Sequence, residues 1–252
     1  MSLDEVFEKV NAAHLREDWR EVLKWEGRKD EMMERQPDAA CNNILGVFAS
    51  AHRRGFKSTV DFSHDHSLSI VRLETRRVEV LGRMQRFRDQ GEVICVVADH
   101  LRVLGTTQEA AGNFQRARKL GEAHGFFLLE CESCFGLGNM ARAEGRDDEG
   151  LVLLRHALVF ALCEGDANGI ELRVLHAFTD ALFQANAIDE VEPLVARFRE
   201  VAQTVSDKQG RPCFGVFHSL YTSAQLHEVL CTCTPRVGST SHCWTPALYQ
   251  GR

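Results

Sequence analysis

One pattern of small and large side chains recurs along this chain at a distance of 40 residues. The matched pairs are Ala98 with Gly138, Leu101 with Ala141, Glu109 with Glu149, Ala110 with Gly150, Phe114 with Leu154, and Ala117 with Ala157. A shift of 41 carries the pattern onward more loosely, from Leu154 to Val195. Self-similarity at this period is typical of repeat proteins, whose units bury their apolar faces by stacking on their neighbours. The chain is therefore expected to be a stack of helix pairs.

The spacing of apolar residues predicts helices and no strands. Apolar side chains recur at helical spacing, two-residue alternation is missing, and there are only five prolines. The predicted helices cover roughly residues 3–15, 18–35, 38–53, 66–88, 91–104, 107–124, 126–144, 147–163, 167–186, 189–205 and 212–229. Capping boxes are predicted from Ser2 with Glu5 and from Thr106 with Glu109, and Asp189 with Glu192 gives a third helix start of this kind.

The stretch Gly136-Leu137-Gly138 has two possible roles, a phosphate-binding loop or a packing site between helices. A phosphate loop needs a strand before it and a helix start after it, because the phosphate sits on the free N–H groups of a helix N-terminus. Here the stretch lies inside a predicted helix, so packing is the better interpretation. Replacing Gly138 with leucine is then expected to overpack the helix crossing and cost about 1–3 kcal/mol of stability.

The spacing of these small residues resembles the consensus of the tetratricopeptide repeat (TPR). The resemblance is carried by Leu137-Gly138, Ala141, Gly150, Leu154 and Ala157. Its period of about 40 resembles the repeats of kinesin light chain more than the standard 34-residue form. The resemblance implies an all-α, right-handed superhelix, a TPR-like solenoid of about five helix pairs.

The domain organisation expected from this resemblance is a single repeat domain over residues 1–230. The repeats are clearest over 91–205, and 1–88 and 207–230 read as degenerate units. Residues 231–252 lack helical spacing and acidic residues, so an irregular or disordered tail is expected. A zinc site at Cys231, Cys233, His242 and Cys243 matches no common ligand spacing. A truncated or mis-spliced gene model is a further explanation of the abrupt change.

Composition narrows the possible partners. The formal charge is −6 with acidic and basic residues intermixed, so neither nucleic acid nor an anionic membrane is expected as a partner. No apolar run is long enough for a membrane span, and the first ten residues do not resemble a secretory signal. With nine cysteines and no such signal, the thiols are expected to be reduced and the protein cytoplasmic.

No residue pattern calls for an active site, a cofactor or a metal. Cys131 and Cys134 form a C-x-x-C on a predicted helix, where core packing is favoured over a metal or redox role. His64 and His66 flank Asp65, and a turn near a helix cap is favoured over a metal site. The chain is accordingly expected not to be an enzyme.

The TPR resemblance also implies a ligand surface. In such arrays the first helices of each pair line a concave groove. Carrying over its positions gives Glu92, Cys95, Asp99 and Arg102 on one helix, Glu132, Phe135, Asn139 and Arg142 on the next, and Arg173, His176, Asp180 and Phe183 on the third. Of these, the peptide-binding groove is predicted at Asp99, Arg102, Phe135, Asn139, Arg142, His176, Asp180 and Phe183. Lysine is missing from these positions, so the lysine-rich carboxylate clamp of some family members is not expected.

The resemblance therefore predicts a scaffold for protein–protein interaction that binds a peptide segment of a partner. Asn139 is predicted to hydrogen-bond a peptide backbone, and Arg102 and Arg142 to hold carboxylates in bidentate fashion. Two alternatives stay open. The chain is a regulatory or adaptor part of a larger assembly, or it is an enzyme with an unrecognised site.

Overall fold

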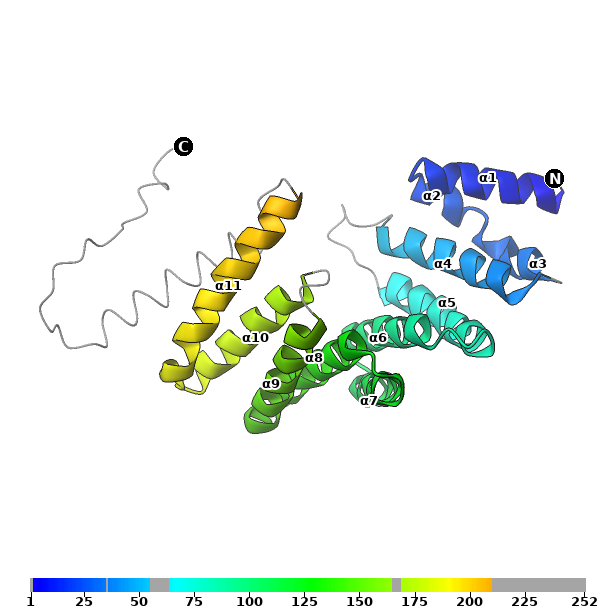
Figure 1. Ribbon diagram of the computed structural model, residues 1–252. Helices are drawn as coiled ribbons and strands as arrows, with labels where there is room; N and C mark the ends of the chain where they lie inside the picture. The colour runs from blue at the N-terminus through cyan, green and yellow to red at the C-terminus, as the bar shows by residue number, and fades with distance from the viewer. Residues whose placement is uncertain (1, 35, 55–63, 165–168, 210–252) are drawn as a thin grey trace, which may run out of the picture. The chain divides into compact units, whose positions relative to one another are not determined.

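The structure is a computed structural model that describes residues 2–34, 36–54, 64–164 and 169–209. All regular structure within these residues is helical (Figure 1). The elements are α1 (Leu3–Leu15), α2 (Trp19–Leu23), the short 3-10 helix η1 (Glu26–Arg28), α3 (Lys29–Met33), α4 (Asp38–Arg54), α5 (His64–Arg83), α6 (Phe87–Val103), α7 (Thr107–His124), α8 (Phe127–Ala143), α9 (Asp147–Glu164), α10 (Ile170–Gln184) and α11 (Ile188–Gln209).

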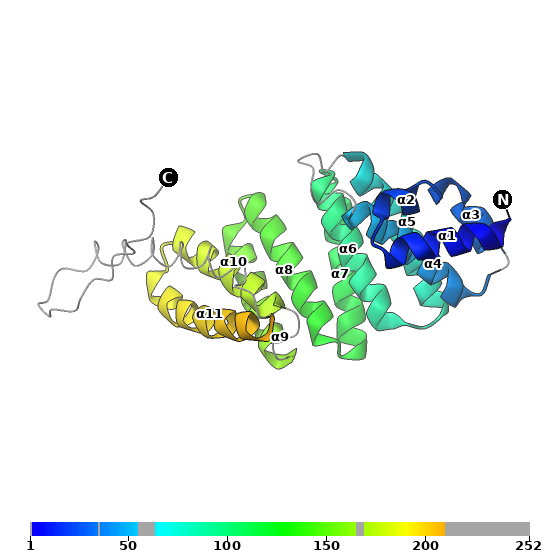
Figure 2. The same cartoon turned by 90° about the horizontal axis from the view of Figure 1, so that it is seen from above.

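Helices that follow one another in the sequence pack against one another. Contacts run from α4 to α5, α5 to α6, and so on to α9 and α10 (Figures 1 and 2). Arg197 on α11 reaches Glu171 on α10 at 2.7 Å, which links the last described helices. Four helix pairs thus follow the shorter helices α1–α3 in the described residues. This confirms the predicted all-α, TPR-like solenoid.

The chain divides into two compact units, Met1–Val201 and Ala202–Arg252. The described part of the second unit is the end of α11. The predicted degenerate unit 207–230 lies almost wholly outside the described residues, and the predicted tail 231–252, with its zinc alternative, lies wholly outside them. The single domain over 1–230 stays a prediction.

The 40-residue period appears directly in the helix boundaries. Helix α6 begins at Phe87 and α8 at Phe127, and α7 begins at Thr107 and α9 at Asp147. The turns within three successive pairs also match, because each places one residue in the left-handed region. These residues are Gly105 (φ 80°), Gly145 (φ 76°) and Asn186 (φ 57°). In each turn the next N–H donates to a carbonyl five residues back, which ends the first helix in the Schellman manner.

Substitutions at two equivalent turn positions are expected to change the free energy of unfolding in opposite directions. Gly145→Ala is expected to lower the free energy of unfolding by about 1–2 kcal/mol, because a Cβ is strained at positive φ. Asn186→Gly is expected to raise it by up to about 1 kcal/mol, because it removes a milder strain of the same kind. Urea unfolding of both variants measures this, and equal shifts of one sign would contradict it.

The two glycines of Gly136-Leu137-Gly138 pack against different neighbours of α8. A Cβ on Gly136 would lie 2.3 Å from the ring of Phe114 on α7. A Cβ on Gly138 would lie 3.0 Å from Leu154 Cγ and 3.2 Å from the Gly150 carbonyl, both on α9. The first glycine therefore lets α7 approach and the second lets α9 approach. The packing interpretation is confirmed.

Several predicted boundaries were wrong. The helix predicted over 18–35 is broken into α2, η1 and α3. The break predicted near residue 90 lies instead at Gln85, which has φ 56°. The Ser2–Glu5 capping box is present. The Thr106–Glu109 box is not formed, because the Thr106 hydroxyl donates to the Leu101 carbonyl of the preceding helix instead.

Candidate functional site

The predicted groove positions lie on the first helices of three successive pairs, α6, α8 and α10. Helix α8 contacts both α6 and α10, so the three helices are neighbours. We call this surface the inner face and define it by Glu92, Cys95, Asp99, Arg102, Glu132, Phe135, Asn139, Arg142, Arg173, His176, Asp180 and Phe183. The structure thus brings residues from three repeats to neighbouring helices.

The guanidinium of Arg142 is used in hydrogen bonds within the fold. Its guanidinium donates to Asp180 Oδ2 and to Gln184 Oε1, both at 2.9 Å, and to the Ala177 carbonyl at 3.3 Å. Only 15% of its side chain is exposed. Arg142 and Asp180 therefore tie α8 to α10, which leaves the arginine little capacity to hold the carboxylate of a partner.

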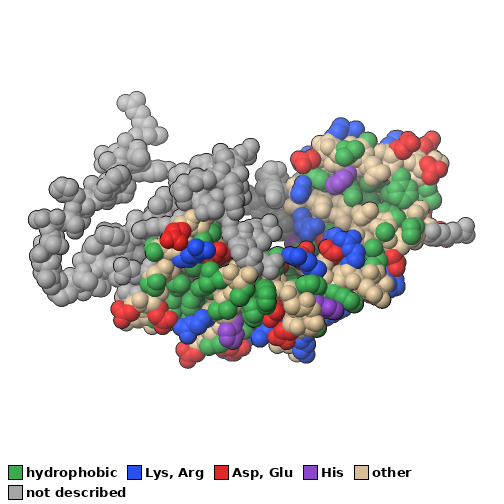
Figure 3. Space-filling model, viewed as in Figure 1, with side chains coloured by type: hydrophobic (Ala, Val, Ile, Leu, Met, Phe, Trp, Pro, Cys, Tyr) green, Lys and Arg blue, Asp and Glu red, His purple; other side chains and the backbone are tan. Residues whose placement is uncertain are grey.

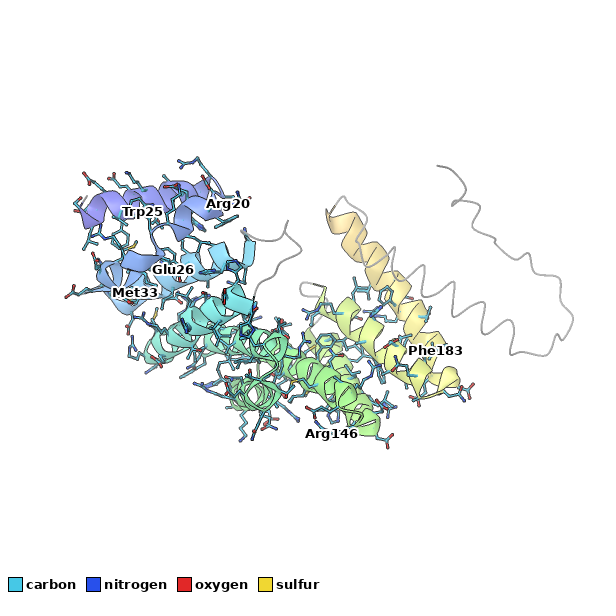
Figure 4. All side chains as sticks on the ribbon, turned by 180° about the vertical axis from the view of Figure 1, so that it is seen from behind. Arg20, Trp25, Glu26, Met33, Arg146 and Phe183 are labelled. Atoms are coloured by element: carbon cyan, nitrogen blue, oxygen red, sulfur yellow. The ribbon has the colours of Figure 1, made fainter. Side chains whose placement is uncertain are left out.

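Aromatic side chains contribute apolar surface to the inner face. Phe135 on α8 is half-buried, and the guanidinium of Arg173 on α10 lies 5.0 Å from its ring centroid. Phe183 near the end of α10 is 38% exposed (Figure 4). Stacking of this kind holds an arginine by cation–π attraction while the ring keeps an accessible edge.

The α6 side of the inner face carries both acidic and basic side chains. Glu132 on α8 is half-buried, and its pKa is raised, chiefly by burial and further by the nearby charges of Glu92 and Asp99, while Arg173 opposes the shift. Asp99 forms an exposed pair with Arg102 at 3.7 Å. Exposed pairs of this length contribute little to stability.

The remaining predicted positions include one buried thiol and two half-buried polar side chains. Cys95 is buried and lies 3.7 Å from the Ser133 hydroxyl of α8, so it seals the contact between α6 and α8. Burial raises the pKa of the Cys95 thiol far above its usual range. Asn139 and His176 are half-buried on α8 and α10.

A cavity of about 630 Å³ lies on the opposite side of α8. Its lining includes Met140 and Leu137, and at 100° per residue Leu137 points away from both Glu132 and Phe135. Its walls come largely from α7 and α9. Arg118 pairs with Glu122, and Arg146 pairs with Glu144 and Glu149. The polar side chains of Thr107, Gln108, Gln115 and Lys119 also line the cavity.

A second polar cluster, which the sequence did not predict, joins η1, α4 and α5. His52 is buried, with its Nε2 2.9 Å from Glu26 Oε2 and its Nδ1 3.2 Å from His66 Nδ1. If the Glu26 carboxylate accepts from Nε2–H, then Nδ1 of His52 accepts from His66, and all three groups are satisfied. Glu26 lies in the N-terminal group of helices (Figure 4).

The stretch from His64 to His66 lies at a helix start, near the predicted helix cap, and forms the first turn of α5. The contact of His66 with His52 was not predicted from the sequence. Within the described residues there is no group of three or more His, Cys, Asp or Glu side chains suited to a metal ion.

The free energy of unfolding is expected to fall on acidification because of Glu26, His66 and His100. Burial, followed by the charge of His52, lowers the pKa of His66, and burial, followed by Arg53, lowers the pKa of His100. Their contribution is complete above the unfolded value of about 6.5 and is lost as the pH falls below it. The hydrogen bond from His52 lowers the pKa of Glu26, whose contribution is lost as the pH falls below about 4.5.

Chemical denaturation at pH 7, 6, 5 and 4 measures this fall. His66→Gln should reduce the loss between pH 7 and 5, because glutamine can still donate to His52 and does not titrate. His64→Gln, in the exposed part of the same turn, is the matched control. Identical pH profiles for wild type and His66→Gln would contradict the prediction.

The C-x-x-C motif lies in the core, as favoured by the sequence. Cys131 and Cys134 are both completely buried with free thiols. Burial raises the pKa of Cys131 to about 12 and that of Cys134 to about 11. Thiols with such pKa values are not thiolates at neutral pH, so they are poor nucleophiles and poor metal ligands.

Comparison with known proteins supports the fold and not a specific activity. No protein-family model matches the chain, and no curated protein matches it. A signal-transduction ATPase (STAND) protein with a tetratricopeptide repeat sensor from Pyrococcus horikoshii has a TM-score of 0.63 at 13% identity. The match covers 91% of this chain and 37% of that protein, so this chain spans little more than a third of it.

Two further solved structures are similar over most of their length. The apo form of RapI has a TM-score of 0.62 at 11% identity, with 92% of this chain and 84% of that one covered. BtubC (BKLC) from P. vanneervenii has a TM-score of 0.53 at 10% identity, with 97% and 98% covered. Together with the repeat geometry, these matches define a TPR-like helical-repeat fold.

One face of the described residues carries side chains of mixed character. Acidic, basic and apolar side chains are interspersed in the view of Figure 3. None of the described helices combines the length and the apolar character that crossing a membrane requires.

Proposed function

We propose that this chain is a protein-interaction scaffold that binds a peptide segment of a partner protein on the inner face. The observation that carries the proposal is that α8 presents half-buried polar groups which the described fold leaves without a hydrogen bond or salt bridge. These groups are Glu132 and Asn139, one turn either side of Phe135. A peptide backbone can satisfy the amide of Asn139, and apolar side chains can pack on Phe135 and Phe183.

The proposal differs from the sequence expectation in its anchor residues. Arg142 and Asp180 hold the repeats together, so they act in the scaffold rather than in binding. Contact with a partner is assigned to Glu132, Phe135, Asn139 and Phe183. The proposal gives the chain no catalytic role, no cofactor and a cytoplasmic location.

A regulatory role within a larger assembly is a second candidate. The observation that favours it is the similarity to a STAND protein, in which a tetratricopeptide repeat region is described as a sensor. A sensor and a scaffold both need a ligand on the repeat face. The same binding test therefore addresses both.

The test compares the purified full chain with a face variant and a matched control in crosslinking pull-downs. The face variant combines Asn139→Lys with Phe183→Ala, and the control combines Gln108→Ala on α7 with Val152→Ala on α9. Val152 is 52% exposed, so the control removes a comparable apolar group elsewhere. The expected result is a partner captured by wild type and control and lost by the face variant at unchanged melting temperature. Equal capture by all three would overturn the proposal.

A further inference from the structure

A pocket between the N-terminal helices and α5 has an excess of positive charge. Its volume is about 540 Å³, within the range of small-molecule sites. Among the described residues that line it, three are basic and one is acidic: Lys29 from α3, Arg72 and Arg76 from α5, and Glu26 from η1. The hydroxyl side chains of Ser69 and Thr75 on α5 also line it. The pocket therefore offers donors for an anion from more than one helix.

Glu26 and Arg76 are already engaged within the fold. Glu26 Oε2 lies 2.9 Å from His52 Nε2, and this hydrogen bond is the main reason why the pKa of Glu26 is lowered. Arg76 pairs with Asp30 of α3 at 2.5 Å. The charge that remains at the pocket is therefore set by Lys29 and Arg72.

Neither Lys29 nor Arg72 forms a hydrogen bond or an ion pair with another side chain in the described part of the chain. Lys29 is half-buried, and its charge lowers the pKa of Glu26 and of Asp30 without an ion pair to either. Arg72 lies one helical turn from Arg76, and like charges at this spacing destabilise a helix. An anion between Lys29 and Arg72 would neutralise both unpaired side chains.

Two other cavities differ from this pocket in charge. Arg76 also lines a cavity of about 620 Å³, whose lining residues include four carboxylates: Asp30, Glu31, Glu34 and Glu79. The cavity beside α8 is lined by three basic and three acidic residues. Of these three cavities, the excess of positive charge belongs to the one that contains Lys29 and Arg72.

We propose that this pocket binds a small phosphate monoester, with the phosphate held between Lys29 and Arg72. At neutral pH such a phosphate carries a charge of about −1.5 to −2, which matches two unpaired cations better than the single charge of a carboxylate. An arginine guanidinium can also hold two phosphate oxygens at once. The hydroxyls of Ser69 and Thr75 donate to the remaining oxygens, and Val71 packs against the apolar part of the ligand.

This site is separate from the inner face and does not depend on the proposed function. Lys29 lies on α3 and Arg72 on α5, whereas the inner face is formed by α6, α8 and α10. Because the phosphate contacts both elements, it ties α3 to α5. A ligand that binds the folded chain in this way also raises its stability.

The test is isothermal titration calorimetry of the full chain at pH 8 and low salt. Three probes share a phenyl ring: phenyl phosphate, benzoate and phenol, which at this pH are a dianion, a monoanion and a neutral molecule. The variants are Lys29→Gln and Arg72→Gln, each of which removes one positive charge. Neither residue has a partner in the described fold, so both variants are expected to fold, and their melting temperatures verify this. The matched control is Arg116→Gln, at an exposed arginine on α7.

Saturable binding of phenyl phosphate, tighter than that of benzoate and not shared by phenol, is the expected result. Lys29→Gln and Arg72→Gln should each lower the affinity about tenfold, and Arg116→Gln should leave it unchanged. Benzoate that binds as tightly as phenyl phosphate would overturn the assignment of a phosphate. No saturable binding at phenyl phosphate concentrations on the order of 10 mM, or equal affinities of wild type, Lys29→Gln and Arg72→Gln, would overturn the site itself.

Discussion

Replacing Gly136 with alanine is expected to lower the free energy of unfolding by about 2–3 kcal/mol. The added Cβ would lie 2.3–2.7 Å from three atoms of the Phe114 ring, well inside van der Waals contact. Phe114 is itself only 1% exposed and belongs to the core between α6, α7 and α8, so its ring has little room to move. Helices α7 and α8 must therefore separate, which weakens the contact between two successive repeats.

The measurement is urea unfolding followed by circular dichroism at 222 nm, with Gly112→Ala as the matched control. Gly112 lies on α7 with open space around its Cβ position, so alanine there should stabilise the helix by up to about 1 kcal/mol. A double variant that adds Phe114→Leu should recover part of the loss from Gly136→Ala. If Gly136→Ala and Gly112→Ala shift stability alike, the packing role assigned to Gly136 is wrong.

The sequence predicted those features of the fold that particular residue types mark along the chain. The 40-residue period could be recognised because the helix crossings require small residues, which occur at positions 138, 150 and 157. Both glycines of Gly136-Leu137-Gly138 lie at contacts with neighbouring helices. The break at Gln85 was missed because a glutamine in the left-handed region leaves no glycine or proline to mark it.

The candidate site was harder to predict, for a different reason. The positions on α6, α8 and α10 followed from the repeat alignment, but alignment says nothing about which side chains pair with each other. Arg142 looks the same in sequence whether it faces a ligand or Asp180. The residues of the cluster Glu26, His52 and His66 come from three different elements, so no spacing in the sequence predicts the cluster.

The second large effect is expected at a buried carboxylate between α4 and α5. Glu74 is completely buried, with ion-pair contacts to Arg53 at 3.1 Å and to Arg77 at 3.3 Å. Arg77 also donates from Nε to Asn42 Oδ1 at 2.8 Å. Arg77→Met should cost about 3 kcal/mol, because it leaves a buried charge with half its partners and a buried amide without its donor.

The neighbouring residue provides the control. Arg76 pairs with Asp30 at 2.5 Å, but both side chains are largely exposed, at 45% and 68%. Arg76→Met should therefore change stability by less than about 1 kcal/mol. Adding Glu74→Gln to Arg77→Met should recover part of the loss, since the amide removes the uncompensated charge while keeping the side-chain volume. If Arg76→Met and Arg77→Met have equal effects, the burial of Glu74 does not contribute to stability. If the double variant is no more stable than Arg77→Met alone, the charge of Glu74 is not the cause of the loss.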